Sequence, residues 1–156
     1  MKDCITFAEP ADEAELKRIF TDTGMDLAGD IEEHVILRNG KRMLAGGMFY
    51  QMDEGLFHLL VFAVSPKEHR QGIGRKFLQQ LSARPWLYCR EATEPEGGFY
   101  RISTIARGPA VPFYLRNQYQ ACDAEQLPFP FDQQCESCPG QKECNPVPML
   151  FVSRST

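Results

Sequence analysis

The most constraining stretch of this sequence is a nearly unbroken apolar run, Leu56 to Val64, which leads through Ser65-Pro66 into a glycine-bearing loop. An apolar run of this length is typical of a central strand that is covered on both faces. The apolar residues after the glycines recur at helical spacing: Ile73, Phe77, Leu78 and Leu81. A buried strand followed directly by a helix predicts an α/β fold with helices on the faces of a sheet.

The other elements are expected from periodicity and turn residues. Asp12-x-x-Glu15 has the pattern of a capping box for a helix over about residues 12–23, and Gly24 is its expected stop. Asn39-Gly40 is the strongest hairpin signal in the chain. A further helix should run from Pro109 to about Tyr119. Strands are expected over residues 4–7, 34–37, 43–52, 56–64, 99–105 and 149–152.

Size and composition fit one compact domain over residues 1–156. Of the 156 residues, 43% are hydrophobic and 24% are charged, which is ordinary for a soluble protein. No apolar run approaches the ~20 residues that a membrane span needs, and the first residues lack the apolar stretch of a secretory signal. We therefore expect a cytoplasmic protein that does not bind a membrane.

Charge is unevenly distributed along the chain. Residues 1–56 hold 12 acidic and six basic residues, residues 57–116 hold four and nine, and residues 117–156 hold five and two. A basic middle block inside an acidic chain suits a small polyanion better than a nucleic acid, which would need a broad basic face. A chance unevenness of solvated surface charge is the alternative.

The loop around Gly72 and Gly74 has the composition of an anion-binding helix start. Backbone N–H groups at a helix N-terminus can point at one phosphate, and residues without a Cβ let the ligand approach closely. The run lacks the Lys-Ser/Thr of a Walker A loop, and Phe77 stands where the dinucleotide fingerprint needs its third glycine. A phosphate or pyrophosphate is the expected ligand, and a glycine turn without a ligand is the alternative.

Two motifs in order resemble the GNAT superfamily of acyl-CoA-dependent N-acetyltransferases. Val64-Ser65-Pro66 followed by Arg70-Gln71-Gly72-Ile73-Gly74 resembles the family's Val-x-Pro and Arg/Gln-x-x-Gly-x-Gly/Ala signature, with His69 at the signature's leading position. The stretch from Ala106 to Tyr119 resembles the later Asn-x-x-Ala-x-x-Phe-Tyr helix. There Arg107 replaces the Asn and Gln118 replaces a Gly, so that Asn117 could supply the left-handed cap instead. The resemblance covers residues 4–120.

This resemblance implies a mixed, mostly antiparallel central sheet of six to seven strands flanked by helices. It also implies acetyl-CoA as the co-substrate, with its pyrophosphate over the glycine loop and with backbone N–H groups of the buried strand as oxyanion donors. The residues that it assigns to the cofactor are Ala63, Val64, Arg70, Gln71, Gly72, Ile73, Gly74 and Arg75.

The resemblance also implies two candidate catalytic residues. Tyr114 matches the family's tyrosine, which protonates the departing CoA thiolate; a phenol with a pKa near 10 keeps its proton at neutral pH. His58 stands six residues before Val64, where several members place a carboxylate base. An unperturbed histidine pKa of ~6.5 suits a base near neutrality. A hydrogen-bonded structural histidine is the alternative.

A cysteine- and proline-rich segment, residues 122–148, is expected as an insertion before the last strand. Its cysteines form a C-x12-C-x2-C-x5-C pattern, and the C-x2-C pair resembles a metal knuckle. Zinc is the leading expectation, while an iron–sulfur cluster, a redox-active disulfide and unconnected thiols remain alternatives. The four candidate ligands are Cys122, Cys135, Cys138 and Cys144.

The sequence thus predicts an N-acetyltransferase that moves an acetyl group from acetyl-CoA to the primary amine of a small molecule or peptide. The alternative is a non-catalytic acyl-CoA sensor or scaffold that uses the cysteine segment for interaction. No nucleic acid is expected as a partner, because residues 117–156 are acidic. The protein is expected to be a monomer or a homodimer.

Overall fold

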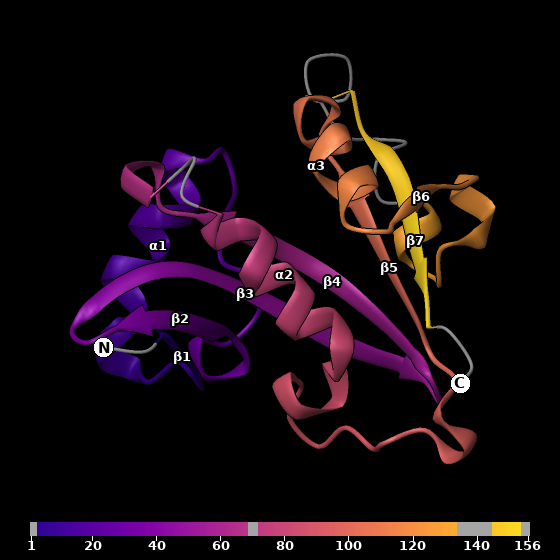
Figure 1. Cartoon of the computed structure of the whole chain (residues 1–156), viewed down its shortest axis with the longest axis horizontal. Coiled ribbons are helices and arrows are strands. Elements are labelled where there is room, and N and C mark those ends of the chain that lie inside the picture. The colour runs from indigo at the N-terminus through magenta and orange to yellow at the C-terminus, as the bar shows by residue number, and fades with distance from the viewer. Residues whose placement is uncertain (1–2, 69–71, 134–144, 154–156) are drawn as a thin grey trace. The chain divides into compact units, whose positions relative to one another are not determined.

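The computed structural model describes residues 3–68, 72–133 and 145–153 (Figure 1). The strands are β1 Asp3–Phe7, β2 Val35–Asn39, β3 Arg42–Asp53, β4 Leu56–Val64, β5 Arg101–Ala106, β6 Gln120–Ala121 and β7 Val147–Val152. The α-helices are α1 Glu13–Asp22, α2 Ile73–Ala83 and α3 Val111–Arg116. The 3-10 turns are η1 Pro10–Asp12, η2 Ile31–Glu33, η3 Pro66–Glu68, η4 Pro85–Tyr88, η5 Glu96–Gly98, η6 Gly108–Ala110, η7 Ala124–Gln126 and η8 Phe131–Gln133.

The strands form a seven-stranded sheet in the order β1-β2-β3-β4-β5-β7-β6. The pairs β1–β2, β2–β3, β5–β7 and β6–β7 are antiparallel. The predicted mixed α/β fold, with a mostly antiparallel sheet and flanking helices, is confirmed. Within the described ranges, no helix is long and apolar enough to cross a membrane.

By its contacts the chain divides into two compact units. Unit 1 comprises Met1–Tyr50 and Leu59–Ala92, and unit 2 comprises Gln51–His58 and Thr93–Thr156. Strand β4 begins in unit 2 and continues into unit 1, as expected of the long apolar run from which it forms. Both faces of β4 are buried, since the consecutive residues His58 and Leu59 are each about 1% exposed.

In unit 1, two adjacent glycines of β3 show which helix covers which face of the strand. A Cβ on Gly46 would clash with Cδ1 of Leu16, which belongs to α1. A Cβ on Gly47 would lie 3.7 Å from Cδ1 of Leu81, which belongs to α2. Because successive strand residues face opposite sides, α1 and α2 cover opposite faces of β3 in unit 1 (Figure 1).

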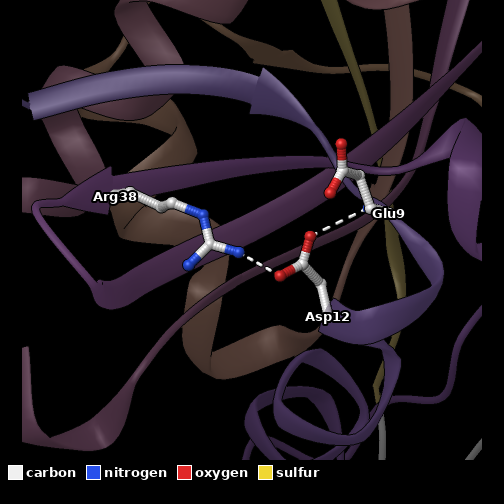
Figure 2. A network of polar contacts seen from close by, with 3 residues as sticks. All are labelled: Glu9, Asp12 and Arg38. Carbon is white, nitrogen blue, oxygen red and sulfur yellow. Dashed lines mark hydrogen bonds and ion pairs between the residues drawn. The ribbon is translucent and has the colours of Figure 1, made fainter.

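The start of α1 differs from the prediction. The capping box expected at Asp12-x-x-Glu15 does not form; a capping box spans Glu9 and Asp12 instead, at η1. Figure 2 shows the reason, because the two carboxylate oxygens of Asp12 are occupied by the backbone N–H of Glu9, at 2.8 Å, and by the guanidinium of Arg38. Helix α1 therefore begins at Glu13 and lacks a side-chain cap.

Two turn predictions in unit 1 are confirmed. Gly24 has a φ of 80° directly after the C-cap of α1, and the N–H of Met25 then bonds to the carbonyl of Phe20 at 2.7 Å. The β2–β3 hairpin turns at Gly40, whose φ is 62°, with Asn39 paired to Arg42.

In unit 2, β5 and β7 pair without a register shift from Arg101 to Ala106. The backbone N–H of Arg101 also bonds to the carbonyl of Gly55 at 2.8 Å, which fixes the start of β5 beside the start of β4. Because this ladder has no bulge, the side chains of β5 alternate strictly between its two faces.

The helix expected from Pro109 to Tyr119 is shorter than predicted. It begins as η6 and ends at Arg116, and the left-handed residue beyond it is Gln118, with a φ of 74°. The expectation that Asn117 supplies this cap is wrong, since its φ is −108°. Its Nδ2 donates instead to the carbonyl of Phe113 at 2.8 Å, which holds the side chain back along the helix.

Candidate active site

The glycine loop of unit 1 ends in an open helix start. Gly72 is the N-cap of α2 with a φ of 72°, and a Cβ placed there would meet no atom of the described residues within 4 Å. The first N–H groups of a helix lack intrahelical partners and attract anions. Ile73 and Gly74 are half-buried and Arg75 is exposed, while Arg70 and Gln71 lie outside the described residues. The helix start thus has the shape and polarity of a phosphate site.

The strand end that precedes this loop is anchored on both sides. Ala63 is 4% exposed, Val64 is half-buried, and the N–H of Ser65 bonds to the carbonyl of Leu44 at 2.8 Å. Glu68, at the end of η3, is buried and pairs with Nη2 of Arg42 at 2.6 Å through one carboxylate oxygen. These contacts fix the backbone from the end of β4 to Glu68.

Tyr114 lies in unit 2 on α3 and is buried. Its side chain makes a hydrogen bond with Thr104 of β5, and burial raises its pKa above the usual range. The ring packs edge-on against Phe113 and Tyr119, with centroids 5.5 and 5.3 Å away. The phenol is therefore held in one orientation and stays protonated at neutral pH.

His58 lies at the start of β4, also in unit 2, and is about 1% exposed. Its Nδ1 is 2.7 Å from Oγ of Ser103 on β5, and its ring stacks on Phe131 of η8 with centroids 3.8 Å apart. Burial lowers the pKa of His58 to about 4. The imidazole is therefore neutral throughout the physiological pH range.

The two candidate catalytic side chains thus bind consecutive residues of one strand. Ser103 contacts His58 and Thr104 contacts Tyr114, and successive residues of the regular β5 ladder face opposite sides. His58 and Tyr114 therefore meet β5 from opposite faces within unit 2.

Ser103, Thr104 and Phe131 were not singled out from the sequence. The available signal was two hydroxyl side chains side by side between apolar residues of a strand, since buried hydroxyls need hydrogen-bond partners. Phe131 gave no signal, because an isolated aromatic residue in a proline-rich segment does not identify its contact.

The cysteine segment is only partly described. Cys122 is half-buried, and burial, with a smaller contribution from Asp123, raises the pKa of its thiol. The other three expected ligands, Cys135, Cys138 and Cys144, lie outside the described residues. Within the part of the chain that the structure describes, no group of three or more His, Cys, Asp or Glu residues could hold a metal ion. Zinc binding stays a prediction.

Residues 3–118 match the model of the acetyltransferase (GNAT) family. The chain belongs to this family. No curated protein sequence matches this GNAT chain.

Solved structures agree with this fold. The GNAT chain is similar to N-acetylglutamate synthase from Neisseria gonorrhoeae, solved with coenzyme A and N-acetyl-glutamate, at 15% identity and a TM-score of 0.73. That match covers 99% of this chain and 36% of the synthase chain, so this chain spans about a third of it.

Shorter chains match over nearly their whole length. The ribosomal-protein-S18-alanine N-acetyltransferase of Escherichia coli matches at 16% identity and a TM-score of 0.63, covering 97% of this chain and 94% of that one. Rv2747 from Mycobacterium tuberculosis, solved with CoA, matches at 15% identity and a TM-score of 0.66, covering 97% and 99%.

Proposed function

We propose that this acetyltransferase transfers the acetyl group to a primary amine of a small molecule or peptide by direct attack in a ternary complex. The observation that carries the proposal is that two consecutive residues of β5 hold the two candidate side chains. Ser103 binds His58 on one face of the strand, and Thr104 binds Tyr114 on the other. Direct attack requires one group that takes a proton from the nitrogen and a second group that gives a proton to the sulfur. Unit 2 holds one group of each kind, a neutral imidazole at His58 and a protonated phenol at Tyr114.

The anion-binding helix start is proposed to hold the pyrophosphate of acetyl-CoA. Backbone N–H groups from Gly72 to Arg75 would bind the phosphate oxygens, with the guanidinium of Arg75 and the residues Arg70 and Gln71 beside them. Backbone N–H groups at Ala63 and Val64 are the proposed donors to the oxyanion of the tetrahedral intermediate. Stabilising that oxyanion lowers the barrier to attack.

Tyr114 is the proposed proton donor. When the tetrahedral intermediate collapses, the carbon–sulfur bond breaks and the electron pair stays on the CoA sulfur. The raised pKa of Tyr114 ensures that the phenol carries the proton that this thiolate needs. Its hydrogen bond with Thr104 keeps the hydroxyl in place between turnovers.

His58 is the proposed proton acceptor. Attack by the neutral amine gives a zwitterionic tetrahedral intermediate, with a positive nitrogen and an oxyanion, and its N–H is more acidic than that of a free ammonium ion. A neutral imidazole with a pKa of about 4 has its lone pair available at any physiological pH. It can take this proton even though it is too weak a base to deprotonate the free ammonium form.

A covalent acetyl-cysteine route has less support. Among the described residues of unit 2, Cys122 is the one cysteine, and burial raises its pKa away from the thiolate form that a nucleophile needs. In unit 1, Cys89 is buried and its Sγ donates to the carbonyl of Phe49 at 3.4 Å. Neither thiol has the environment of an activated nucleophile.

The test is calorimetric titration with CoA and acetyl-CoA, followed by thiol release over a panel of primary amines. We expect binding of both cofactors and turnover on at least one amine, with no acetyl-enzyme detectable by mass spectrometry when the amine is omitted. Binding without turnover on any amine would favour the sensor alternative. Acetyl-enzyme formed in the absence of the amine would overturn direct attack.

A further inference from the structure

The side chain of His58 makes two contacts in unit 2 that fix its ring. Nδ1 lies 2.7 Å from Oγ of Ser103, and one ring face lies against Phe131 with an interplanar angle of 9°. Ser103 is fully buried, so its hydroxyl cannot turn to bulk water. The ring is thus held at one nitrogen and covered on one face.

The contacts of Ser103 indicate which nitrogen of His58 carries the proton. Oγ of Ser103 also lies 3.5 Å from the carbonyl oxygen of Phe57, and a carbonyl can only accept. When the serine hydroxyl donates to Phe57, its oxygen must accept from Nδ1–H of His58. The lone pair of the neutral ring then lies on Nε2.

We propose that Ser103 and Phe131 are positioning residues for His58, which together hold its ring neutral with Nδ1 protonated and the lone pair on Nε2. This inference rests on the proposed function, because it specifies which atom of His58 accepts the amine proton. It also gives the proline-rich segment a role, since Phe131 belongs to the expected insertion over residues 122–148.

Loss of hydration, rather than a neighbouring charge, keeps the ring of His58 neutral. Strand β4 carries no other charged side chain, β5 carries the exposed Arg101, and η8 carries Asp132 next to Phe131. Burial lowers the pKa of His58. The aromatic face of Phe131 provides part of that burial.

The first test reads the tautomer directly. Nitrogen-15 NMR distinguishes protonated from unprotonated imidazole nitrogens, and His58→Gln assigns the signal among the three histidines of the chain. We expect Nε2 of His58 to be unprotonated at pH 7 in the full-length protein. A protonated Nε2 would overturn the inference.

Substitutions of Ser103 separate positioning from packing. Ser103→Ala should move the tautomer toward Nε2–H and lower kcat roughly tenfold, and Ser103→Thr, which keeps the hydroxyl, should restore both. Ser82→Ala removes another buried serine hydroxyl, in unit 1, and should change neither readout. An unchanged tautomer in Ser103→Ala would contradict the proposal.

Substitution of Phe131 tests the covered face. Phe131→Ala should raise the pKa of His58 by about one unit toward 6.5, and the acidic limb of the kcat/KM profile should move with it. Phe131→Leu should retain most of the burial and most of the low pKa. Phe99→Ala, which removes an exposed aromatic ring from unit 2, is the control. An unmoved His58 pKa in Phe131→Ala would refute the role of Phe131.

The NMR and kinetic readouts separate this inference from the proposed function. If the His58 tautomer and pKa respond as expected while the pH–rate profile stays unchanged, the positioning holds and His58 is not the proton acceptor. If neither NMR property responds, the positioning fails whether or not the enzyme acetylates an amine.

Discussion

The rings of His58 and Phe131 lie almost parallel in unit 2, with centroids 3.8 Å apart. A charged imidazolium at this site would lose its hydration without gaining a counter-ion, so the folded protein disfavours it. The unfolded chain imposes no such cost. Protonation of His58 therefore couples the stability of the protein to pH.

The first prediction concerns this coupling. The pKa of His58 is about 4 in the folded state against 6.5 in the unfolded state, so the unfolded state binds more protons between these values. The free energy of unfolding should fall by up to about 3 kcal/mol as the pH drops from 6.5 to 4, and this loss should be absent in His58→Gln.

Urea denaturation of both proteins at pH 7.5 and 4.5 measures the difference. His34 also has a pKa lowered by burial and acts in the same direction, but it is present in both proteins and cancels. Equal pH dependence in the two proteins would show that His58 is not buried neutral.

The second prediction concerns the hydroxyl of Tyr114. Tyr114→Phe should lower thiol release roughly a hundredfold at saturating substrates while CoA affinity stays the same, because a general acid contributes at least this factor. Tyr119→Phe is the matched control, since it removes a hydroxyl from a buried ring 5.3 Å away. Turnover of Tyr114→Phe at the wild-type rate would exclude the proton-donor role.

The third prediction uses two glycines with nearly the same backbone. Gly72 and Gly97 have φ values of 72° and 78°, and within the part of the chain that the structure describes a Cβ on either would meet nothing within 4 Å. Alanine at either position should destabilise the protein by about 1 kcal/mol. Only Gly72→Ala should weaken CoA binding in calorimetry, since its methyl group would project where the pyrophosphate is proposed to lie. Equal affinities would argue against the helix start as the phosphate site.

The fourth prediction tests the close packing of α1 on β3. A Cβ on Gly46 would clash with Cδ1 of the fully buried Leu16. Gly46→Ala should cost about 1–3 kcal/mol of stability, and combining it with Leu16→Ala should cost less than the sum of the two changes. A double-mutant cycle in urea measures this coupling, and strict additivity would disprove the contact.

The fifth prediction concerns the cysteine segment. Purified protein should contain about one equivalent of zinc by elemental analysis, and Cys135→Ser or Cys138→Ser should lose it. Arg116→Ser changes an exposed residue outside the segment and should retain the metal. If the folded protein contains no metal and its thiols stay reduced, these cysteines neither bind zinc nor form a disulfide.

Local patterns predicted the elements whose boundaries are set locally. Strand β4 has the predicted bounds of residues 56–64, because a glycine precedes the apolar run and a proline closes it. The turns predicted at Gly24 and Gly40 were also correct, because a positive φ strongly favours glycine.

The errors arose where a distant residue or an unusual conformation decides the outcome. Asp12 does not cap α1 because Arg38, which is far from it in sequence, engages its carboxylate. Helix α3 ends early because Gln118, which replaces the family's Gly, itself adopts the left-handed conformation that we expected Asn117 to supply. Contacts of the candidate site, such as His58 with Phe131, are also long-range, so the motifs located His58 without revealing what holds it.

The alternation of β5 also limits how this chain can vary. Inserting or deleting one residue inside the strand would turn Ser103 and Thr104 each to the other face and exchange their partners. The loop over residues 91–98, which leads to β5, is under no such constraint, provided that the bond from Arg101 to Gly55 is kept. In descendants of this chain, changes of length should therefore accumulate in the loop and be absent from the strand.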